Sequence, residues 1–249
     1  MRSLTRDLTG EVAVVTGASS GIGAATARAL ADEGMSVALA ARRAERLESL
    51  AADVADGPGE ALAVPTDVTD RAAVDALIEG TVDAFGDLDV FVNNAGVMLL
   101  QQVADADPDD WETMVDVNLS ALMYASKAAL PHLRGGGDLV QVSSVAGRTT
   151  SETAAGYNAT KWGVNAFTDA LRKEETENGV RTTVIEPGAV ETELQEHIPD
   201  EEVKRRIEGW VESMDALRPE DIAAGVLYAV GQPRHVSVNE LMIRPTDQP

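Results

Sequence analysis

The sequence predicts an α/β fold in which helices cover both faces of a doubly wound parallel sheet, forming a three-layer αβα sandwich. Short apolar runs alternate with helical segments from end to end of the 249 residues. The runs are continuous in Val, Ala, Leu and Ile, which is typical of strands buried on both faces. No linker or low-complexity stretch divides the chain. We therefore expect a single domain over residues 1–249, although length alone would also allow two small ones.

The elements follow one another in a βαβα order. Val12–Thr16 is the first predicted strand, and a glycine-rich turn follows it. Apolar residues recur at helical spacing over Ile22–Glu33, Gly34 ends that helix, and Ser36–Ala41 is the second strand. Further strands are predicted at Ala61–Thr66, Leu88–Asn93, Asp138–Ser143, Arg181–Glu186 and Glu240–Ile243. Ligands of such sheets bind beyond the carboxyl ends of the strands, so the residues after each strand are the candidates for function.

An acidic run at residues 107–110, with the sequence Asp-Pro-Asp-Asp, could hold a metal ion or begin a helix. Asp followed by Pro supplies an N-cap, a preset first turn and acids at the positive end of the helix dipole, so we favour capping. The three histidines, His132, His197 and His235, show no ligand spacing. We therefore expect no catalytic metal.

A segment near the carboxyl end mixes acidic and basic residues around a weak helical pattern. It covers Glu191–Met214 and is either a lid, at about residues 189–215, or a solvated helical excursion. We expect this segment, with Met98–Leu100 and Thr149–Thr153, to surround the substrate. Packing in the core would explain the apolar residues of this set equally well.

Composition excludes several classes of function. The chain has 42 Asp and Glu against 20 Lys and Arg, a net charge of −22, which repels nucleic acid and anionic lipid. The absence of cysteine excludes disulfides and suits the cytosol. No apolar run is long enough to cross a bilayer, and the start lacks a signal-peptide core, so we expect a cytoplasmic protein. The acidic surface is typical of salt adaptation, with a basic partner as the alternative.

The first turn between strand and helix contains Gly17, Gly21 and Gly23 in the order TGASSGIG. Glycines there allow a sharp turn and a close approach to a pyrophosphate, whose charge the helix N-terminus attracts. Glycines also serve ordinary turns and helix packing. The position after the first strand and before the first helix favours nucleotide binding.

Tyr157 and Lys161 are four residues apart in a helical stretch, so they lie on one face. A fixed ammonium group lowers the pKa of a nearby phenol, and the pair therefore suits acid–base work. An ordinary exposed pair on a helix is the alternative. Ser144 follows the fifth strand, where its hydroxyl could bind a carbonyl oxygen or merely cap a turn.

The motifs that carry a family resemblance follow the strands in order: the TGxxxGxG turn, Asp67-Val68, Asn93-Asn94-Ala95-Gly96, the set Asn118, Ser144, Tyr157 and Lys161, and Pro187-Gly188 with Thr192. With them the chain resembles the classical short-chain dehydrogenase/reductase family over almost its whole length. The resemblance implies a Rossmann fold, a nicotinamide cofactor and a homotetramer. The expected cofactor contacts are Gly17, Ser19, Ser20, Gly21, Ile22, Gly23, Arg42, Arg43, Asp67, Val68, Asn94, Ala95, Gly96, Tyr157, Lys161, Pro187, Gly188, Val190 and Thr192.

The choice between the two nicotinamide cofactors depends on the end of the second strand. An acid there would bind the ribose 2′-hydroxyl, but this chain has Ala41 followed by Arg42 and Arg43. Guanidinium groups suit a 2′-phosphate, so we expect NADP rather than NAD. The alternative is that the two arginines begin a solvated helix. Ser20 stands where some NADP-dependent relatives have a basic residue.

The resemblance also implies the catalytic roles. Tyr157 gives the proton, Lys161 lowers its pKa and binds the nicotinamide ribose, Ser144 rather than Ser143 holds the carbonyl oxygen, and Asn118 anchors a proton-relay water. The expected activity is reversible, NADP-dependent hydride transfer between nicotinamide and a small carbonyl or alcohol substrate. Residues 218–222 and 235–240 resemble the subgroup of NADP-dependent 3-hydroxy acid and serine dehydrogenases. A 3-oxoacyl thioester reductase and a non-catalytic NADPH sensor are the alternatives.

Overall fold

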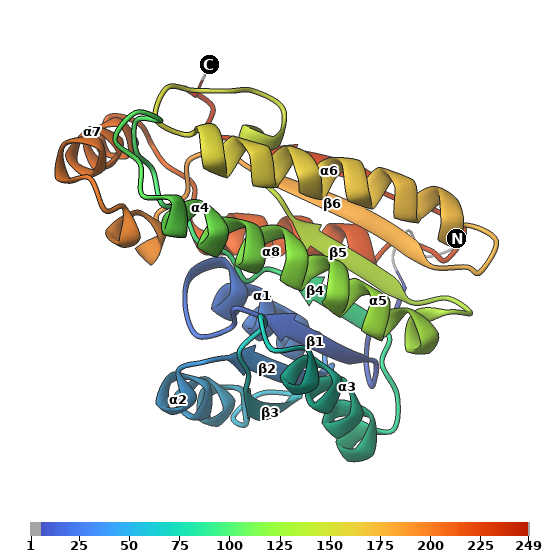
Figure 1. Cartoon of the computed structure of the whole chain (residues 1–249). Helices are drawn as coiled ribbons and strands as arrows, with labels where there is room; N and C mark the ends of the chain where they lie inside the picture. The colour runs from blue at the N-terminus through green and yellow to red at the C-terminus, as the bar shows by residue number, and fades with distance from the viewer. Residues whose placement is uncertain (1–5, 249) are drawn as a thin grey trace.

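The computed structural model describes residues 6–248, so the first five residues and the last one of the expected domain lie outside it. A seven-stranded sheet, parallel throughout, forms its centre (Figure 1). The strands are β1 (Val12–Thr16), β2 (Ser36–Ala41), β3 (Glu60–Pro65), β4 (Val90–Asn93), β5 (Asp138–Val142), β6 (Arg181–Pro187) and β7 (Glu240–Ile243). Their spatial order is β3-β2-β1-β4-β5-β6-β7. The predicted doubly wound sheet is confirmed.

Helices cover both faces of this sheet (Figure 1). One face packs against α1 (Gly21–Asp32), α2 (Ala44–Val54) and α8 (Pro219–Val230), and the other against α3 (Arg71–Phe85), α5 (Ala121–Leu133) and α6 (Ala155–Glu175). Leu30 of α1 and Val226 of α8 are fully buried in the first layer, as Leu77 of α3 and Ala129 of α5 are in the second. The strands are apolar on both sides because both of their faces are covered.

The predicted ends of several elements are off by one or two residues. The fourth strand begins at Val90 rather than Leu88, the fifth ends at Val142 rather than Ser143, and α1 begins at Gly21. Leu88 and Ser143 are nevertheless buried. Apolar patterning follows burial, whereas the strand ladder follows hydrogen bonding, and the two end at different residues.

The remaining elements lie in the segments that connect these strands and helices along the chain. They are α4 (Pro108–Val115), a π-helical turn η1 (Asp116–Ser120), the 3₁₀ turns η2 (Val145–Gly147) and η3 (Glu193–His197), and α7 (Glu201–Glu212). The Asp107 side chain accepts a hydrogen bond from Asp109 N and Pro108 occupies the first turn of α4, which confirms the predicted cap. Within residues 6–248, no group of three or more metal-ligating side chains comes together. None of the described helices combines the length and apolar character that a membrane span requires.

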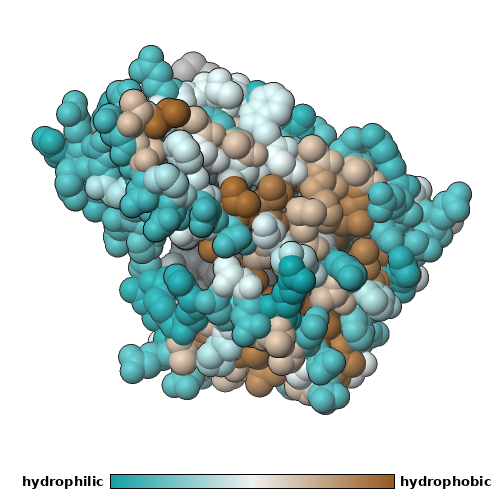
Figure 2. All heavy atoms as spheres, viewed as in Figure 1, coloured by the Kyte–Doolittle hydropathy of each residue, from teal (hydrophilic) through white to brown (hydrophobic). Residues whose placement is uncertain are grey.

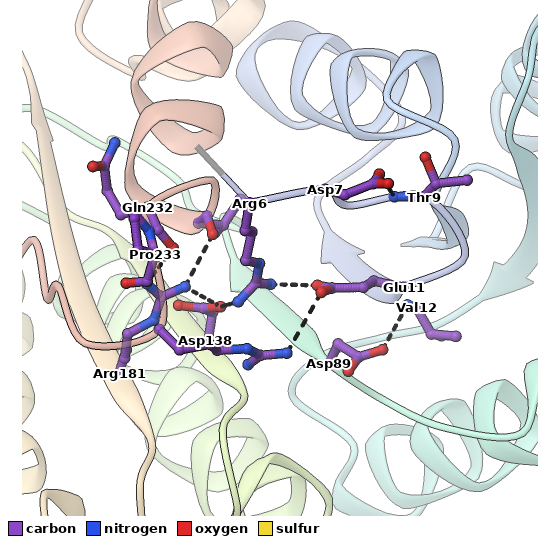
Figure 3. A network of polar contacts seen from close by, with 12 residues as sticks. Arg6, Asp7, Thr9, Glu11, Val12, Asp89, Asp138, Arg181, Gln232 and Pro233 are labelled. Carbon is purple, nitrogen blue, oxygen red and sulfur yellow. Dashed lines mark hydrogen bonds and ion pairs between the residues drawn. The ribbon is translucent and has the colours of Figure 1, made fainter. Parts of the chain in front are cut away.

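A buried ionic network joins the strands at their amino-terminal ends (Figure 3). Arg181, at the start of β6, pairs with Asp138, at the start of β5, at 2.8 Å. Arg181 also donates to four backbone carbonyls at the end of α8 and just after it, among them Val230 O at 2.9 Å. Arg6 bridges Asp138, at 3.1 Å, and Glu11. Because burial of a charge is costly unless it is paired, these contacts hold the rim of the sheet that faces away from the carboxyl ends.

The order of the strands creates the crevice. The chain runs outward from β1 to β3 in one direction and from β4 to β7 in the other, so the connections diverge between β1 and β4. In open α/β sheets, such a switch point leaves a ligand crevice at the carboxyl ends of the strands.

Candidate active site

The turn from β1 to α1 lies against the turn that follows β4. Gly17 has φ +67°, and a Cβ atom placed there would lie 2.8 Å from Asn94 Nδ2. A Cβ at Gly23 would lie 2.3 Å from Gly17 O. Larger residues at either position would therefore collide with the neighbouring chain. The glycine pattern predicted from the sequence has a steric cause.

Thr16 connects the two turns, a contact that we did not predict as part of the site. Its hydroxyl accepts hydrogen bonds from Asn94 N at 3.0 Å and Ala95 N at 3.1 Å. Asn94 Nδ2 donates in return to Thr16 O at 2.9 Å. Thr16 precedes the glycine motif directly, and a hydroxyl at the end of a central strand was the signal that could have indicated this role.

The start of α1 fits the diphosphate of a dinucleotide. Ser20 is the N-cap residue, but its side chain makes no capping hydrogen bond, and the first turn contains no acidic residue. Instead the Ser19 and Ser20 hydroxyls accept from Arg43 Nε at 3.0 Å and Arg43 Nη2 at 2.7 Å. Backbone N–H groups, hydroxyls and a guanidinium therefore come together beside glycines that allow close approach, and Ile22 follows directly in the helix.

Arg42 and Arg43 diverge after β2. Arg43 faces the glycine turn, whereas Arg42 lies near Asp67. Hydrogen bonds from Thr69 lower the pKa of Asp67, and the charge of Arg42 lowers it further. Val68 and Ala95 line a small cavity between these turns. The predicted adenosine contacts thus lie on neighbouring strand ends.

Tyr157 and Lys161 both lie on α6 and are both buried. Lys161 Nζ lies 5.7 Å from the centre of the Tyr157 ring. It donates a hydrogen bond to Val142 O, at the carboxyl end of β5, at 3.0 Å. The two side chains therefore share one side of the helix, next to the open rim of the sheet, as their spacing predicts.

The pKa values of this pair depart from our expectation. Burial raises the pKa of Tyr157 to about 12, and the hydrogen bond with Ser144 only partly opposes this rise. Burial lowers the pKa of Lys161 to about 8. We predicted that the ammonium would lower the pKa of the phenol, but the loss of water on burial dominates, and the Lys161 ammonium donates to Val142 O.

The structure separates the two serines after β5. Ser144 Oγ accepts a hydrogen bond from Ala146 N at 3.1 Å and takes part in a hydrogen bond with the Tyr157 side chain. Ser143 is buried, and its hydroxyl donates to Lys161 O at 3.4 Å. Ser144 is therefore the serine whose hydroxyl contacts the phenol.

Asn118 lies within the π-helical turn between α4 and α5 and is buried. Its amide accepts from Val97 N and donates to Val97 O, both at 2.8 Å, and donates to Thr160 Oγ1 at 3.2 Å. A Cβ at Gly96 would lie 3.3 Å from Asn118 Oδ1 and 3.8 Å from Lys161 Nζ. Local π-helix often accompanies functional sites, because it turns a side chain out of the regular helical register.

The segment after β6 covers the crevice. Pro187 ends β6, Gly188 N bonds to a β7 carbonyl, and Val190 forms a parallel bridge with Leu217. Thr192 caps η3, and its methyl carbon lies 3.2 Å from the position of a Cβ at Gly21. This segment therefore lies directly over the start of α1.

Apolar residues of the same segment pack against the candidate acid–base group. Ile198, at the end of η3, and Val203 of α7 form a cluster with Tyr157, Leu100 and Met114. Figure 1 shows α7 at one end of the molecule, beside the start of α4. The weak helical pattern thus forms a 3₁₀ turn and a helix that close over the site.

Met98–Leu100 and Thr153, of the other residues expected around the substrate, also meet here, whereas residues 149–152 are exposed. Met98 and Leu99 are half-buried against the same cluster. Thr153 has the left-handed value φ +67°, and its hydroxyl accepts a hydrogen bond from Arg206 Nη2 of α7 at 2.9 Å. A cation of the covering segment therefore lies at the edge of the apolar wall.

Glu193 and Arg46 lie beside Arg43, at the end of the site where we expect the adenosine, and sequence analysis missed them both. Glu193, the first residue of η3, pairs with Arg43 at 2.9 Å and with Arg46 of α2 at 2.7 Å. Hydrogen bonds from the two arginines lower the pKa of Glu193 to about 2. Glu193 lies far from both arginines in the sequence, so no local pattern indicates the contact.

A parallel sheet with a glycine-lined crevice at its switch point, and with a buried tyrosine and lysine beside that crevice, defines the class of nucleotide-binding oxidoreductases. The short chain dehydrogenase family matches residues 11–203, and the chain belongs to this family. An uncharacterized oxidoreductase of Staphylococcus haemolyticus is 42% identical over 241 residues, which cover 96% of this chain and 99% of that protein.

Solved structures of similar proteins contain a bound cofactor. The closed form of a serine dehydrogenase complexed with NADP+ has a TM-score of 0.87 at 32% identity, covering 96% of both chains. An alcohol dehydrogenase from the archaeon Thermococcus sibiricus, complexed with 5-hydroxy-NADP, has a TM-score of 0.84 at 31% identity, covering 96% of this chain and 98% of the other.

The lowered pKa of Lys161 is measurable in the ligand-free protein. We expect the ¹³C resonance of one lysine side chain to titrate with a midpoint of about 8, because burial disfavours its charged form. The Lys161→Met variant, which lacks that resonance, assigns it. A midpoint at or above the ordinary value for lysine would contradict the burial that we describe.

Proposed function

We propose that this protein is an NADP(H)-dependent reductase and dehydrogenase that interconverts a carbonyl compound and a secondary alcohol. The observation that carries this proposal is the buried pair of Tyr157 and Lys161, which lies with Ser144 at the end of β5, near Gly96. A phenol in contact with a serine hydroxyl and near an ammonium group is suited to proton transfer at a carbonyl oxygen.

The chain's own residues transfer the proton and orient the substrate. Ser144 and Tyr157 donate hydrogen bonds to the carbonyl oxygen, and Tyr157 releases its proton to that oxygen as the carbonyl carbon accepts hydride. Bound NADPH supplies this hydride from the nicotinamide ring. The ammonium of Lys161 stabilises the phenolate that remains, and in alcohol oxidation the same groups act in reverse.

The phenolate regains its proton through a relay that we assign to Asn118. Asn118 Oδ1 and Lys161 Nζ both lie near Gly96, at 3.3 and 3.8 Å from the position that a Cβ atom there would occupy. Two polar groups that lie near the same backbone position can be bridged by a water molecule. Such a water would connect Lys161 to the solvent during turnover.

The preference for NADPH is supported by the cation after β2. Arg43 joins the Ser19 and Ser20 hydroxyls, so a basic group reaches the position of Ser20 from another element. Guanidinium and hydroxyl donors together favour a 2′-phosphate over a 2′-hydroxyl. The similar structures that contain NADP are consistent with this preference.

A small 3-hydroxy acid or a related hydroxy compound is the substrate that we favour. The covering segment, at about residues 189–215, combines an apolar wall with Arg206, and one similar structure is a serine dehydrogenase. A cation at the edge of an apolar pocket suits a substrate with a carboxylate. We assign this segment the role of a lid on the single domain.

We further propose a cytoplasmic, salt-adapted homotetramer. Val115, Met123 and Trp162 are exposed. Figure 2 shows apolar residues gathered toward the middle of the face that α5 and α6 present, with hydrophilic residues around its margins. An apolar patch of this kind supports association of copies of the chain. The net charge of −22 supports stability in salt, and the lack of cysteine suits the cytosol.

Replacement of the phenol hydroxyl tests the proposed reaction. We expect Tyr157→Phe to lower kcat for ketone reduction by about 10²–10⁴-fold, since the proton donor is removed. Binding of NADPH should remain within about twofold, because the ring is kept. Tyr228→Phe, at an exposed tyrosine of α8, is the matched control. Reduction rates are measured over a panel of ketones and 3-oxo acids. Activity of Tyr157→Phe equal to that of the control would contradict the proposal.

Removal of the cation tests the cofactor preference. Arg43→Ala should raise KM for NADPH by about ten- to a hundredfold, because hydrogen bonds to a charged group are lost, and should change KM for NADH little. Steady-state kinetics with both cofactors measure the difference. Arg28→Ala, at an exposed ion pair of α1, is the control. Equal changes for NADPH and NADH would show that Arg43 does not select the phosphate.

A further inference from the structure

A carboxylate occupies the cationic site at the end of β2. Glu193 Oε2 lies 2.9 Å from Arg43 Nη1, and Glu193 Oε1 lies 2.7 Å from Arg46 Nη1. Both oxygens of the carboxylate accept hydrogen bonds from Arg46. The same Arg43 donates through its other nitrogens to Ser19 and Ser20. Five side chains thus form one connected network around this anion.

This set of groups matches the chemistry of a phosphate monoester. Two guanidinium groups and two hydroxyls supply several N–H and O–H donors around one anion, as phosphate oxygens require. A carboxylate satisfies some of the same donors, because it presents two oxygens of like geometry. Arg46 was not expected here, but it lies in the first turn of α2 and donates to the same anion as Arg43.

Glu193 reaches this site from the covering segment. It follows Thr192, whose methyl carbon lies 3.2 Å from the position of a Cβ at Gly21. The backbone of the segment is therefore held over the start of α1, and the Glu193 side chain extends from there to the arginines. A cofactor whose diphosphate lies on α1 and whose 2′-phosphate meets Arg43 has to displace this carboxylate.

We propose that Glu193 is a specificity-determining residue that occupies the 2′-phosphate site, and that Arg46 is a second phosphate ligand beside Arg43. This inference rests on the NADPH preference proposed above. Binding of the 2′-phosphate exchanges one anion for another at the two arginines. The Glu193 carboxylate therefore competes with the 2′-phosphate of NADP+ for this site. NAD+ carries a hydroxyl at this place and leaves the ion pairs in place. Glu193 therefore weakens the binding of NADP+ and leaves the binding of NAD+ unchanged.

The competition operates over the whole working range of pH. The two arginines hold the pKa of Glu193 at about 2, so the carboxylate stays ionised near neutrality. The ion pairs are partly exposed, and each contributes modestly. The affinity of a ligand falls in proportion to the fraction of protein in which its site is free, which sets the size of the expected effect.

Calorimetric titration of the full chain with NADP+ and with NAD+ tests this inference. Glu193→Gln should lower Kd for NADP+ by about three- to tenfold at low salt and leave Kd for NAD+ unchanged, because only the phosphate competes. The gain should shrink as salt is added. Glu196→Gln removes the same charge from the same 3₁₀ turn, at an exposed residue, and should change neither constant.

A second comparison isolates Arg46. In the Glu193→Gln background, Arg46→Ala should raise Kd for NADP+ about tenfold without a change for NAD+. An unchanged Kd for NADP+ would show that Arg46 does not bind the 2′-phosphate.

The outcomes distinguish this inference from the proposed function. A wild-type chain that prefers NADP+ to NAD+, with Glu193→Gln indistinguishable from Glu196→Gln, would overturn the role of Glu193 and keep the cofactor preference. Weaker binding of NADP+ to Glu193→Gln would overturn it as well. Equal affinity of the wild-type chain for both cofactors would overturn the preference itself, and this inference with it.

Discussion

The hydrogen bond from the Lys161 ammonium to Val142 O places a cation inside the protein where the central sheet ends. Few positions in a fold tolerate a buried lysine, and burial here lowers its pKa to about 8. α6 presents Tyr157 on the same side, one turn earlier, and the strand end supplies Ser144 as its partner. The chemistry that we propose depends on the sheet keeping these three groups together.

The two rims of the sheet serve different purposes. At the amino-terminal rim, Arg181 and Asp138 form a buried ion pair, and Nη1 and Nη2 of Arg181 also donate to backbone carbonyls. At the carboxyl-terminal rim, Arg43 bonds to side chains of the glycine turn and to the Glu193 carboxylate, which we propose that the cofactor phosphate replaces. A paired and buried network is costly to break, whereas partly exposed pairs exchange at small cost. Stability and binding are thus separated by the direction of the strands.

Much of the fold and part of the site could be predicted from the sequence, because local patterns carry them. Continuous apolar runs indicate strands buried on both faces, and the glycines near Gly17 indicate a sharp turn, which the structure places against Asn94. The spacing of Tyr157 and Lys161 places them on one side of a helix. The contact between Arg43 and Glu193 could not be predicted, since it joins segments that only the folded chain brings together. Our prediction of the direction of the Tyr157 pKa shift was wrong, because the shift depends on burial, which is a property of the tertiary structure.

The pKa of Tyr157 in the complex with NADP+ tests the central claim most directly. It can be followed through the ¹³C resonance of the Tyr157 ring carbon that bears the hydroxyl, assigned by comparison with Tyr157→Phe. The positive nicotinamide ring and the ammonium of Lys161 should together lower that pKa by several units from about 12, into the range in which a phenol exchanges protons near neutrality. A pKa that stays at its ligand-free value in the complex would contradict the account.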